Sequence, residues 1–368
     1  TAVAAWREDR TSFPWSYDMF PALEGKPVYG GYYTREEIKD IVAYAAKRQI
    51  TIVPEIEMPG HSWAALYAYP ELTCSGKPYL RAPDQPVDFT DPYCAGNEKT
   101  FQFLEDVIGE VAELFPSPYI HLGGDEAKKG PWEHCAKCRR RMAEEGLENV
   151  GQLQSYFMKR MEKIVLSKGR KVIGWDEILE GGLPSDAAVM SWRGEEGGIE
   201  AAKAGHYTVM TPHFNTYLNY GQSVNSALPY EVTPLEKVYS YDPVPRDLNS
   251  EQQRYILGIQ GCLWTEYIQN MKMAEYQLLP RMLALAETGW TPGEEKEYDH
   301  FLRRLPMHYS IFLSGKNFYI APPSGISGHE AFRNSFRLKL ENTMGIGEVR
   351  FTTGKEGPGK GSRLYKGP

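Results

Sequence analysis

Short apolar runs alternate with amphipathic stretches along most of the chain. Six of these runs end in Gly, Pro or polar residues: "ITIVPEIEM" (50–58), "YIHLGG" (119–124), "KVIGW" (171–175), "AAVMSW" (187–192), "HYTVMTP" (206–212) and "YILGIQGCLW" (255–264). Runs of this length and composition are typical of buried strands. Their alternation with helical stretches predicts an α/β fold in which parallel strands are covered by helices.

The stretches between the runs have helical periodicity. Thr34 and Glu37 are spaced as a capping box at the start of one stretch. The apolar positions that follow lie on one face of the predicted helix: Ile38, Ile41, Val42 and Ala45. Segments 98–115 and 150–169 also carry apolar residues at helical spacing.

Two architectures fit this alternation, an open doubly wound sheet and a closed (β/α)8 barrel. An open sheet that binds dinucleotides should carry G-x-G-x-x-G after its first strand, and the chain has no convincing copy. Instead, polar or aromatic residues follow nearly every run: Glu55, Glu57, Asp125, Glu126, Trp175, Asp176, Glu177, Trp192, Tyr217, Trp264 and Glu266. Such residues converge at the mouth of a barrel, so the pattern favours an α/β fold of the TIM-barrel type.

The number of runs falls short of a complete barrel, because about six are found where a closed barrel takes eight. We expect the first two strands to be missing from the N-terminus. Residues 1–320 are then the catalytic barrel portion. Beyond "APPSG" the character changes to "FRLKLEN" and "EVRFTTG", so residues 321–368 are expected to form a linker and part of a small β domain.

Composition narrows the possible partners. The net charge of −7 comes from 48 acidic and 41 basic residues that are mixed along all 368 positions. This pattern lacks the basic stripe that a phosphate backbone requires, which argues against nucleic acid. No run of 18 apolar residues occurs, which argues against a membrane span, and the first residues lack the features of a signal peptide.

The cysteines leave one question open. Cys74 and Cys94 bracket a loop rich in Pro, Gly and Asp, where a disulfide is one possibility and would favour an oxidising compartment. Cys135 and Cys138 form a C-x-x-C, but no second ligand pair follows, so we expect neither a zinc ribbon nor any other metal or cofactor. Cys262 is expected to be a buried free thiol.

The adjacent carboxylates Asp125 and Glu126 are the strongest candidates for chemistry. Gly123 and Gly124 before them supply the conformational freedom that lets both side chains turn toward one ligand. Two carboxyls held close together cannot easily both ionise, which yields an acid and an anion at one pH, as glycoside hydrolysis needs. The alternative is that the pair simply complements a helix dipole, but its position after a buried strand favours chemistry.

Six motifs together carry a resemblance to a known family. They are "PEIEMPGH" (54–61), "HLGGDE" (121–126), "GWDEI" (174–178), "SWRG" (191–194), "TYLNY" (216–220) and "GCLWTE" (261–266). In this order and spacing, from about Trp6 to residue 315, the chain resembles glycoside hydrolase family 20, the β-N-acetylhexosaminidases. The tail is similar to the small β domain that follows the barrel in many bacterial members.

The resemblance implies a retaining mechanism in which the substrate's own acetamido oxygen attacks the anomeric carbon. In this scheme Glu126 is the general acid and later the base. Asp125 accepts a hydrogen bond from the acetamido N–H and stabilises the positive charge of the intermediate. Tyr217 donates its hydroxyl to the acetamido carbonyl.

The other motifs are implied to bind the sugar. By the resemblance, Trp175, Trp192 and Trp264 wall the pocket, Glu266 binds a ring hydroxyl, and His61 lies near the leaving-group side as an electrostatic partner. Taken singly, each Trp also fits ordinary core packing and the His fits a structural hydrogen bond. Glu57 and Asp176 fit either a supporting role behind the site or ion pairs at the strand ends.

The chain also departs from the family pattern. Asn219 stands where the family usually has Asp, and an amide lacks the charge-assisted strength of a carboxylate toward a sugar hydroxyl. Family members take a sugar-binding Arg from the first barrel strand and an Asp from the second, and neither strand is visible here.

These observations predict an exo-acting β-N-acetylhexosaminidase that removes terminal N-acetylglucosamine or N-acetylgalactosamine from oligosaccharides or glycoconjugates. Two alternatives stay open: a carbohydrate-binding remnant without turnover, and a hydrolase of the same family that resembles lacto-N-biosidase. The expected location is the periplasm or the outside of the cell. Oligomeric state cannot be inferred from these residues.

Overall fold

The computed structural model describes residues 33–77, 91–222, 231–265, 267–268, 270–314, 337–340, 348–353 and 357–367. The chain divides into two compact units. The first unit comprises Thr1–Met210 and Val244–Gly258, and the second comprises Thr211–Pro243 and Ile259–Pro368. Each unit is described by itself.

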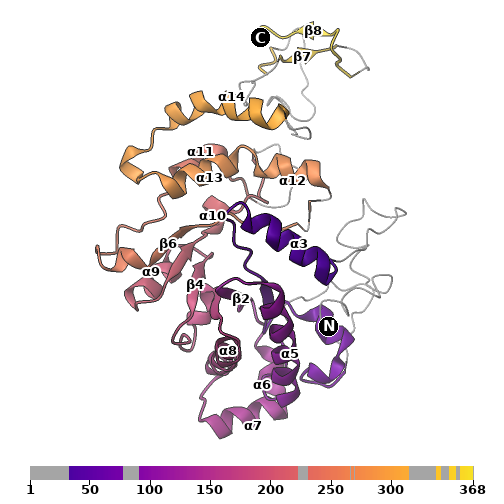
Figure 1. Ribbon diagram of the computed structural model, residues 1–368, viewed down its shortest axis with the longest axis vertical. Coiled ribbons are helices and arrows are strands. Elements are labelled where there is room, and N and C mark those ends of the chain that lie inside the picture. The colour runs from indigo at the N-terminus through magenta and orange to yellow at the C-terminus, as the bar shows by residue number, and fades with distance from the viewer. Residues whose placement is uncertain are drawn as a thin grey trace. The chain divides into compact units, whose positions relative to one another are not determined.

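The first unit alternates strands with helices (Figure 1). Its strands are β1 (Glu55–Met58), β2 (Tyr119–Gly123), β3 (Lys171–Trp175), β4 (Ala188–Ser191), β5 (Thr208–Met210) and β6 (Ile256–Ile259, whose last residue the division assigns to the second unit). Its α-helices are α3 (Arg35–Ala46), α4 (Trp63–Ala68), α5 (Glu98–Leu114), α6 (Gly130–His134), α7 (Ala136–Glu145), α8 (Val150–Ser167) and α9 (Glu196–Lys203). Single 3₁₀ turns are η3 (Pro70–Leu72), η4 (Asp176–Leu179) and η5 (Gln252–Tyr255).

The six strands form one sheet in the order β1-β2-β3-β4-β5-β6. The pairings from β1 to β5 are all parallel, with registers such as Ile120 opposite Val172 and Trp175 opposite Met190. The predicted parallel α/β architecture is therefore confirmed. Within the described residues the sheet does not close, which is consistent with an incomplete (β/α)8 barrel.

Alternation along the strands separates two faces of the sheet. Ile120 and Leu122 of β2 lie in the hydrophobic core that α5 and α8 share with the sheet. His121, which lies between them, points to the opposite face, where Glu55 and Trp175 also lie. In a barrel this opposite face is the interior, so these strands present polar side chains to the axis.

The first predicted strand is shorter than its apolar run. Residues 51–54 are irregular, and β1 begins only at Glu55, directly after Pro54, which has no N–H to give to a ladder. Between β1 and β2, Glu55 to Met58 spans the same stretch as His121 to Gly123, so β1 contains a bulge. Bulges redirect side chains, and this one lies beside Glu57.

Helix starts follow local capping rules. The predicted capping box of α3 is confirmed, because the Thr34 hydroxyl accepts from Glu37 N and the Glu37 carboxylate accepts from Thr34 N. Asn97 and Asn149 cap α5 and α8 through their side-chain oxygens, which accept from Lys99 N and Gln152 N. These two long helices pack beside one another and cover the same side of the strands (Figure 1).

The second unit is mainly helical. Its α-helices are α10 (His213–Thr216), α11 (Leu235–Ser240), α12 (Met271–Leu278), α13 (Arg281–Trp290) and α14 (Tyr298–Ser314), with one 3₁₀ turn, η6 (Gly293–Glu295). A separate core joins α11, α13 and α14 through Val238, Ala284 and Tyr309. The predicted run 255–264 is divided, because β6 ends at Ile259 and Cys262 pairs instead with Tyr217.

Near the C-terminus, β7 (Arg350–Phe351) pairs antiparallel with β8 (Arg363–Leu364). The strand expected from "EVRFTTG" is thus present in shortened form, whereas residues 337–340 of "FRLKLEN" are not a strand. The expected boundary at residue 320 lies outside the described residues. The division into a barrel portion and a small β domain stays a prediction.

The cysteines differ from expectation in one respect. All five are free thiols, so Cys74 and Cys94 do not form a disulfide. The expectation that Cys135 and Cys138 lack a second pair is wrong, because that pair precedes them in the chain: the sulfurs of Cys74 and Cys94 lie beside theirs. Cys262 is confirmed as a buried free thiol.

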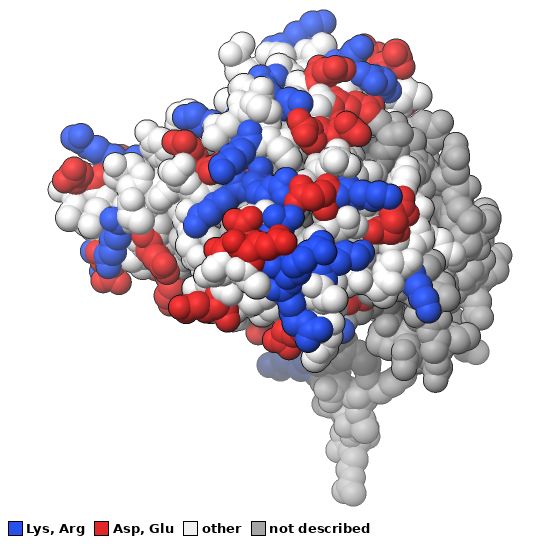
Figure 2. Space-filling view, turned by 90° about the horizontal axis from the view of Figure 1, so that it is seen from below, with Lys and Arg blue, Asp and Glu red and all other residues white. Residues whose placement is uncertain are grey.

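The surface carries charges of both signs. On the face shown in Figure 2, basic and acidic side chains interleave, and neither sign gathers into one continuous patch. Arg141 and Arg160, for example, both pair with Glu98. Among the described helices, none has the length and hydropathy that crossing a membrane would require.

Candidate active site

The loop after β2 brings two carboxylates to the end of the sheet. Gly123 and Gly124 have φ of 69° and 103°, a region that residues with a Cβ rarely adopt. A Cβ on Gly123 would lie 1.7 Å from the Glu57 carboxylate, and one on Gly124 would lie 2.4 Å from Ile178. Both glycines are therefore required for the turn that presents Asp125 and Glu126.

His61 lies against both carboxylates. Its Nε2 is 3.2 Å from Oε2 of Glu126 and 3.4 Å from Oδ2 of Asp125. Hydrogen bonds to Asp125 and then to Glu126 raise the pKa of His61 to about 10. The imidazolium form is therefore favoured at neutral pH, and its positive charge faces both carboxyl groups.

The backbone at this contact is strained. His61 and Glu126 have φ of 46° and 50°, in the left-handed region that costs non-glycine residues about 1–3 kcal/mol each. The two loops also approach closely, because a Cβ on Gly60 would lie 3.1 Å from the carbonyl oxygen of Asp125 and 3.2 Å from Cα of Ala127. Surrounding contacts thus hold the His61 and Glu126 side chains in one arrangement.

Glu57 supports Asp125 from inside the sheet. Burial and the neighbouring charges of Asp125 and Glu55 raise the pKa of Glu57 well above its usual range. A neutral Glu57 can donate a hydrogen bond to Asp125 while its Oε1 accepts from Gly124 N at 3.1 Å. Glu57 therefore lies directly behind Asp125, and its supporting role stays a prediction.

Asp125 retains one unused acceptor. Its Oδ2 faces His61, while Oδ1 is buried and has no hydrogen-bond partner among the described residues. The Asp125 side chain is 16% exposed and that of Glu126 is 49% exposed. The pair therefore combines a sheltered acceptor with a carboxyl group that solvent can reach.

A network on the inner face of the sheet holds Trp175. Its indole N–H donates to Oε1 of Glu55 at 2.9 Å, and its ring packs against that of His121 with centroids 4.8 Å apart. Nδ1 of His121 is 3.1 Å from the same Glu55 oxygen. His121 was not among the site residues predicted from the sequence. Alternation along β2 places its side chain on the inner face, opposite to Ile120 and Leu122, which face the core.

Trp192 is held by the segment after β3. Its indole N–H donates to Oε2 of Glu177 at 2.9 Å, and its backbone N–H donates to Oδ2 of Asp176 at 3.1 Å. Burial raises the pKa of Glu177 to about 7. Asp176 also accepts from Arg193 Nε at 2.6 Å, so it both supports Trp192 and forms an ion pair.

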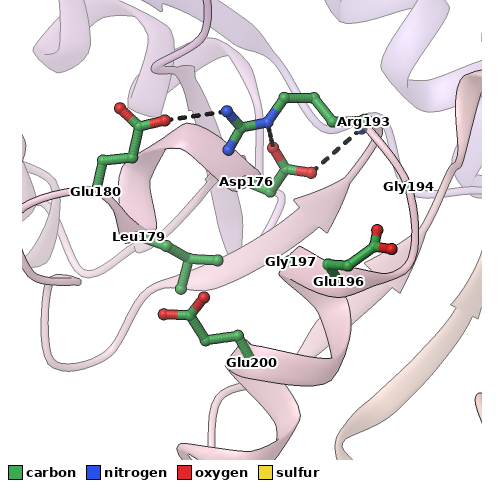
Figure 3. Close-up of a pocket in the computed structure, with 8 residues that line it drawn as sticks. All are labelled: Asp176, Leu179, Glu180, Arg193, Gly194, Glu196, Gly197 and Glu200. Carbon is green, nitrogen blue, oxygen red and sulfur yellow. Dashed lines mark hydrogen bonds and ion pairs between the residues drawn. The ribbon is translucent and has the colours of Figure 1, made fainter.

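A pocket of about 330 Å³ lies beside this ion pair (Figure 3). It is lined by Asp176, Leu179, Glu180, Arg193, Gly194, Glu196, Gly197 and Glu200. Figure 3 shows the Arg193 guanidinium between the Asp176 and Glu180 carboxylates, and it donates to Glu180 at 3.0 Å. The lining does not include Asp125 or Glu126, so this pocket is separate from the carboxylate loop.

The second unit carries three further predicted residues. Tyr217 and Asn219 are buried, and Trp264 is partly exposed with its ring centroid 6.5 Å from that of Tyr217. Asn219 Oδ1 is buried without a hydrogen-bond partner among the described residues. Glu266, the remaining predicted residue, lies outside the described residues.

Arg281 organises the segment that carries Tyr217 and Asn219. It is fully buried and donates to the carbonyl oxygens of Leu218, Tyr220 and Thr233. Gln277 adds hydrogen bonds to the carbonyls of Asn219 and Tyr220. The sequence reasoning missed Arg281, because a cation bound by carbonyl groups leaves no pattern of paired charges.

Within the first unit, then, the predicted residues His61, Asp125 and Glu126 meet directly. A comparison with family models matches residues 1–293 to the glycosyl hydrolase family 20 catalytic domain. The chain belongs to this family. The match covers most of the chain and includes every motif from which the resemblance was drawn.

Relatives of this glycosyl hydrolase family 20 chain include a β-hexosaminidase of Porphyromonas gingivalis, which is 45% identical over 348 residues, covering 92% of this chain and 45% of that protein. The crystal structure of a β-N-acetylhexosaminidase from Bacteroides fragilis matches with a TM-score of 0.68 and 35% identity, over 83% of this chain and 63% of that one.

A third relative is a family 20 exo-β-N-acetylglucosaminidase from Vibrio harveyi, solved in complex with N-acetylglucosamine. It has a TM-score of 0.68 and 33% identity, over 79% of this chain and 46% of that one. The chain spans about half the length of these curated relatives. These similarities identify the family and the fold.

Proposed function

We propose that the protein is an exo-acting β-N-acetylhexosaminidase that uses a retaining, substrate-assisted mechanism. One observation carries the proposal: two adjacent carboxylates share His61 but differ in exposure, and the sheltered one keeps a free acceptor oxygen among the described residues. The named relatives support the same activity.

In the first step, the acetamido carbonyl oxygen of the substrate bonds to the anomeric carbon while the glycosidic bond breaks. Glu126 gives its proton to the departing oxygen, for which its exposed position is suitable. Asp125 Oδ1 accepts from the acetamido N–H, and the Asp125 charge stabilises the cationic intermediate. Neutral Glu57 keeps Asp125 oriented.

In the second step, water attacks the anomeric carbon from the side that the aglycone left. Glu126 takes the proton from this water, and the acetamido oxygen departs, which restores the acetamide. Two inversions at one carbon give net retention. By motif, Tyr217 is assigned to the acetamido carbonyl, and Trp175, Trp192, Trp264, Asn219 and Glu266 to the sugar.

A carbohydrate-binding remnant is less well supported, because a protein that only binds sugar needs neither an exposed acid nor a second carboxylate with a neutral donor behind it. Choice between N-acetylglucosamine and N-acetylgalactosamine, and a wider disaccharide pocket, stay open for assay. Location in the periplasm or outside the cell stays a prediction that cell fractionation would test.

The test is release of nitrophenol from the β-N-acetylglucosaminide and the β-N-acetylgalactosaminide by the full protein. Glu126→Gln and Asp125→Asn should each lower kcat by about 10²-fold or more. The matched control is the adjacent exposed acidic pair on α5, changed as Glu105→Gln and Asp106→Asn, which should retain activity. Wild-type turnover in both site variants would refute the assignment.

Azide and product analysis separate the two roles. Azide should restore turnover of Glu126→Gln on an activated substrate, because the anion attacks the anomeric carbon of the intermediate directly and needs no base to remove a proton. It should restore Asp125→Asn far less, because that variant lacks orientation of the acetamide. Proton NMR of the first product should show the β-anomer; an α-anomer would exclude retention.

A further inference from the structure

Four cysteine sulfurs gather on the helix side of the sheet. The Sγ atoms of Cys74, Cys94, Cys135 and Cys138 all lie within 4.8 Å of one another. Three of the separations are 3.7 Å (Cys94 to Cys138), 3.8 Å (Cys94 to Cys135) and 3.9 Å (Cys74 to Cys138). All four are free thiols, and all but Cys74 are buried.

These separations match the dimensions of a tetrahedral metal site. Sulfurs bound at about 2.3 Å to a central zinc ion lie about 3.8 Å from one another, since that is the edge of the corresponding tetrahedron. A disulfide would need two of the sulfurs at about 2.05 Å. The cluster therefore has the spacing of four ligands around one ion.

The backbone is built to bring the two pairs together. Gly96, two residues after Cys94, packs on the turn between Cys135 and Cys138, where a Cβ would lie 2.2 Å from the carbonyl carbon of Lys137 and 2.4 Å from Cys138 N. Only glycine fits at that distance. Cys135 lies between α6 and α7, and Cys138 lies near the start of α7. The sulfurs of both cysteines can therefore face the same point.

We propose that Cys74, Cys94, Cys135 and Cys138 bind one zinc ion in a closed structural site. Tetrahedral sets of four thiolates select zinc or iron over harder cations. Zinc has no redox activity, and four protein ligands leave no position for water or substrate, so the ion has a structural role.

The site fastens the connections that carry the candidate catalytic residues. Cys74 and Cys94 lie in the connection from β1 to α5 that also carries His61, and Cys135 and Cys138 follow the loop that carries Glu126. Between them, the Trp132 indole donates to the carbonyl of Tyr93 at 2.8 Å, and Tyr93 N donates to the carbonyl of Pro59 at 2.9 Å. The ion would thus stabilise both loops without contacting substrate.

Metal content of the purified full protein tests the proposal, independently of any glycosidase assay. Inductively coupled plasma mass spectrometry should find about one zinc per chain, and Cys74→Ser or Cys138→Ser should lower that content about tenfold or more. The matched control is Cys262→Ser, which removes the buried cysteine outside the cluster and should leave the zinc content unchanged.

Intact mass under denaturing, non-reducing conditions distinguishes the competing states. Four free thiols together with stoichiometric zinc support the proposal. A mass lower by four hydrogens would reveal two disulfides, and stoichiometric iron would reveal a different centre; either result overturns it. Absence of any metal from protein with four reduced thiols also overturns it.

Cobalt replacement keeps the test decisive if the serine variants fail to fold. Wild-type protein exchanged with Co²⁺ should show thiolate-to-metal charge-transfer absorption and the intense visible bands of tetrahedral cobalt, and added zinc should bleach both. The weak spectrum of octahedral cobalt, or no cobalt binding, would refute four-sulfur coordination.

Discussion

Two polar groupings occupy the same loops of the first unit, and they are built in opposite ways. In the carboxylate site, Glu126 is half exposed, His61 carries a raised pKa, and both backbones have positive φ. In the cysteine cluster, three of four side chains are buried, and Gly96 allows close packing. In the proposed roles, the group that exchanges protons with a ligand stays accessible at a cost in strain, whereas the group that holds structure is enclosed.

This contrast predicts that the carboxylate site contributes activity with little stability and that the cluster does the reverse. The largest effect is expected for Glu126→Gln, which removes the acid but keeps the side chain's shape. Activity on substrates with poor leaving groups should fall about 10²–10⁴-fold. The thermal unfolding midpoint, followed by circular dichroism, should match that of the wild type. A large drop in the midpoint would mean that Glu126 is structural.

Removal of the metal should have the second-largest effect. A ligand present at about 100 times its Kd contributes about 2.7 kcal/mol to the free energy of unfolding, so a chelator should lower stability by about that much or more. Denaturant unfolding with and without chelator measures it, with Cys262→Ser as the control protein. Unchanged stability in protein that had contained zinc would show that the ion is not structural.

Glu57 sharpens the comparison, because it is a carboxyl that acts as a neutral donor. Glu57→Gln keeps a donor for Asp125 and should retain activity within about threefold. Glu57→Ala leaves Asp125 without this donor and should lower kcat/KM about 10- to 100-fold, since hydrogen bonds to charged groups are worth about 1.5–3 kcal/mol. If Gln were as harmful as Ala, Glu57 would have to act as an anion.

A smaller effect is expected for Gly60→Ala. The added methyl would meet the Asp125 carbonyl at 3.1 Å and Ala127 Cα at 3.2 Å, so the loops must separate by a few tenths of an ångström. We expect kcat to fall about two- to tenfold, because His61 and Glu126 lose alignment. The control is Gly109→Ala in α5, where the added methyl would meet Lys168 Cε at an ordinary 3.9 Å, and it should leave kcat unchanged.

The smallest effect concerns pH. His61 has a pKa of about 10 in the folded protein, above its ordinary value of 6.5, so its charge stabilises the fold fully below about pH 6.5. That contribution is lost as pH rises through about 10. NMR titration of His61 should show the raised pKa, and Glu126→Gln should lower it. An ordinary pKa in the wild type would mean that the imidazole does not contact the carboxylates.

Local patterns predicted much of the first unit. The strands β2, β3 and β4 and the helices α5 and α8 begin and end within about two residues of the expected positions, because apolar period, proline and capping residues all act locally. Gly123 and Gly124 were expected to permit the turn that presents Asp125 and Glu126, and their positive φ values agree with that reason.

Other features had no local signature. His121 and Glu55 support Trp175 only because parallel strands place them on one face. The sulfurs of Cys74 and Cys138 lie close together although the two residues are 64 positions apart. The second cysteine pair precedes the C-x-x-C in the chain, whereas the prediction considered only a pair that follows it. Arg281 binds carbonyl groups that are distant in sequence.

The sequence by itself determined the family, the alternation of strands and helices, and the carboxylate pair, because each depends on residues close together or on motifs in a set order. Only the tertiary structure decided which charges are shared, which carboxyl is neutral and which thiols meet. Those properties depend on burial and on distances of a few ångströms between segments far apart in the chain, and hydrogen bonds, pKa values and metal coordination all change steeply over such distances.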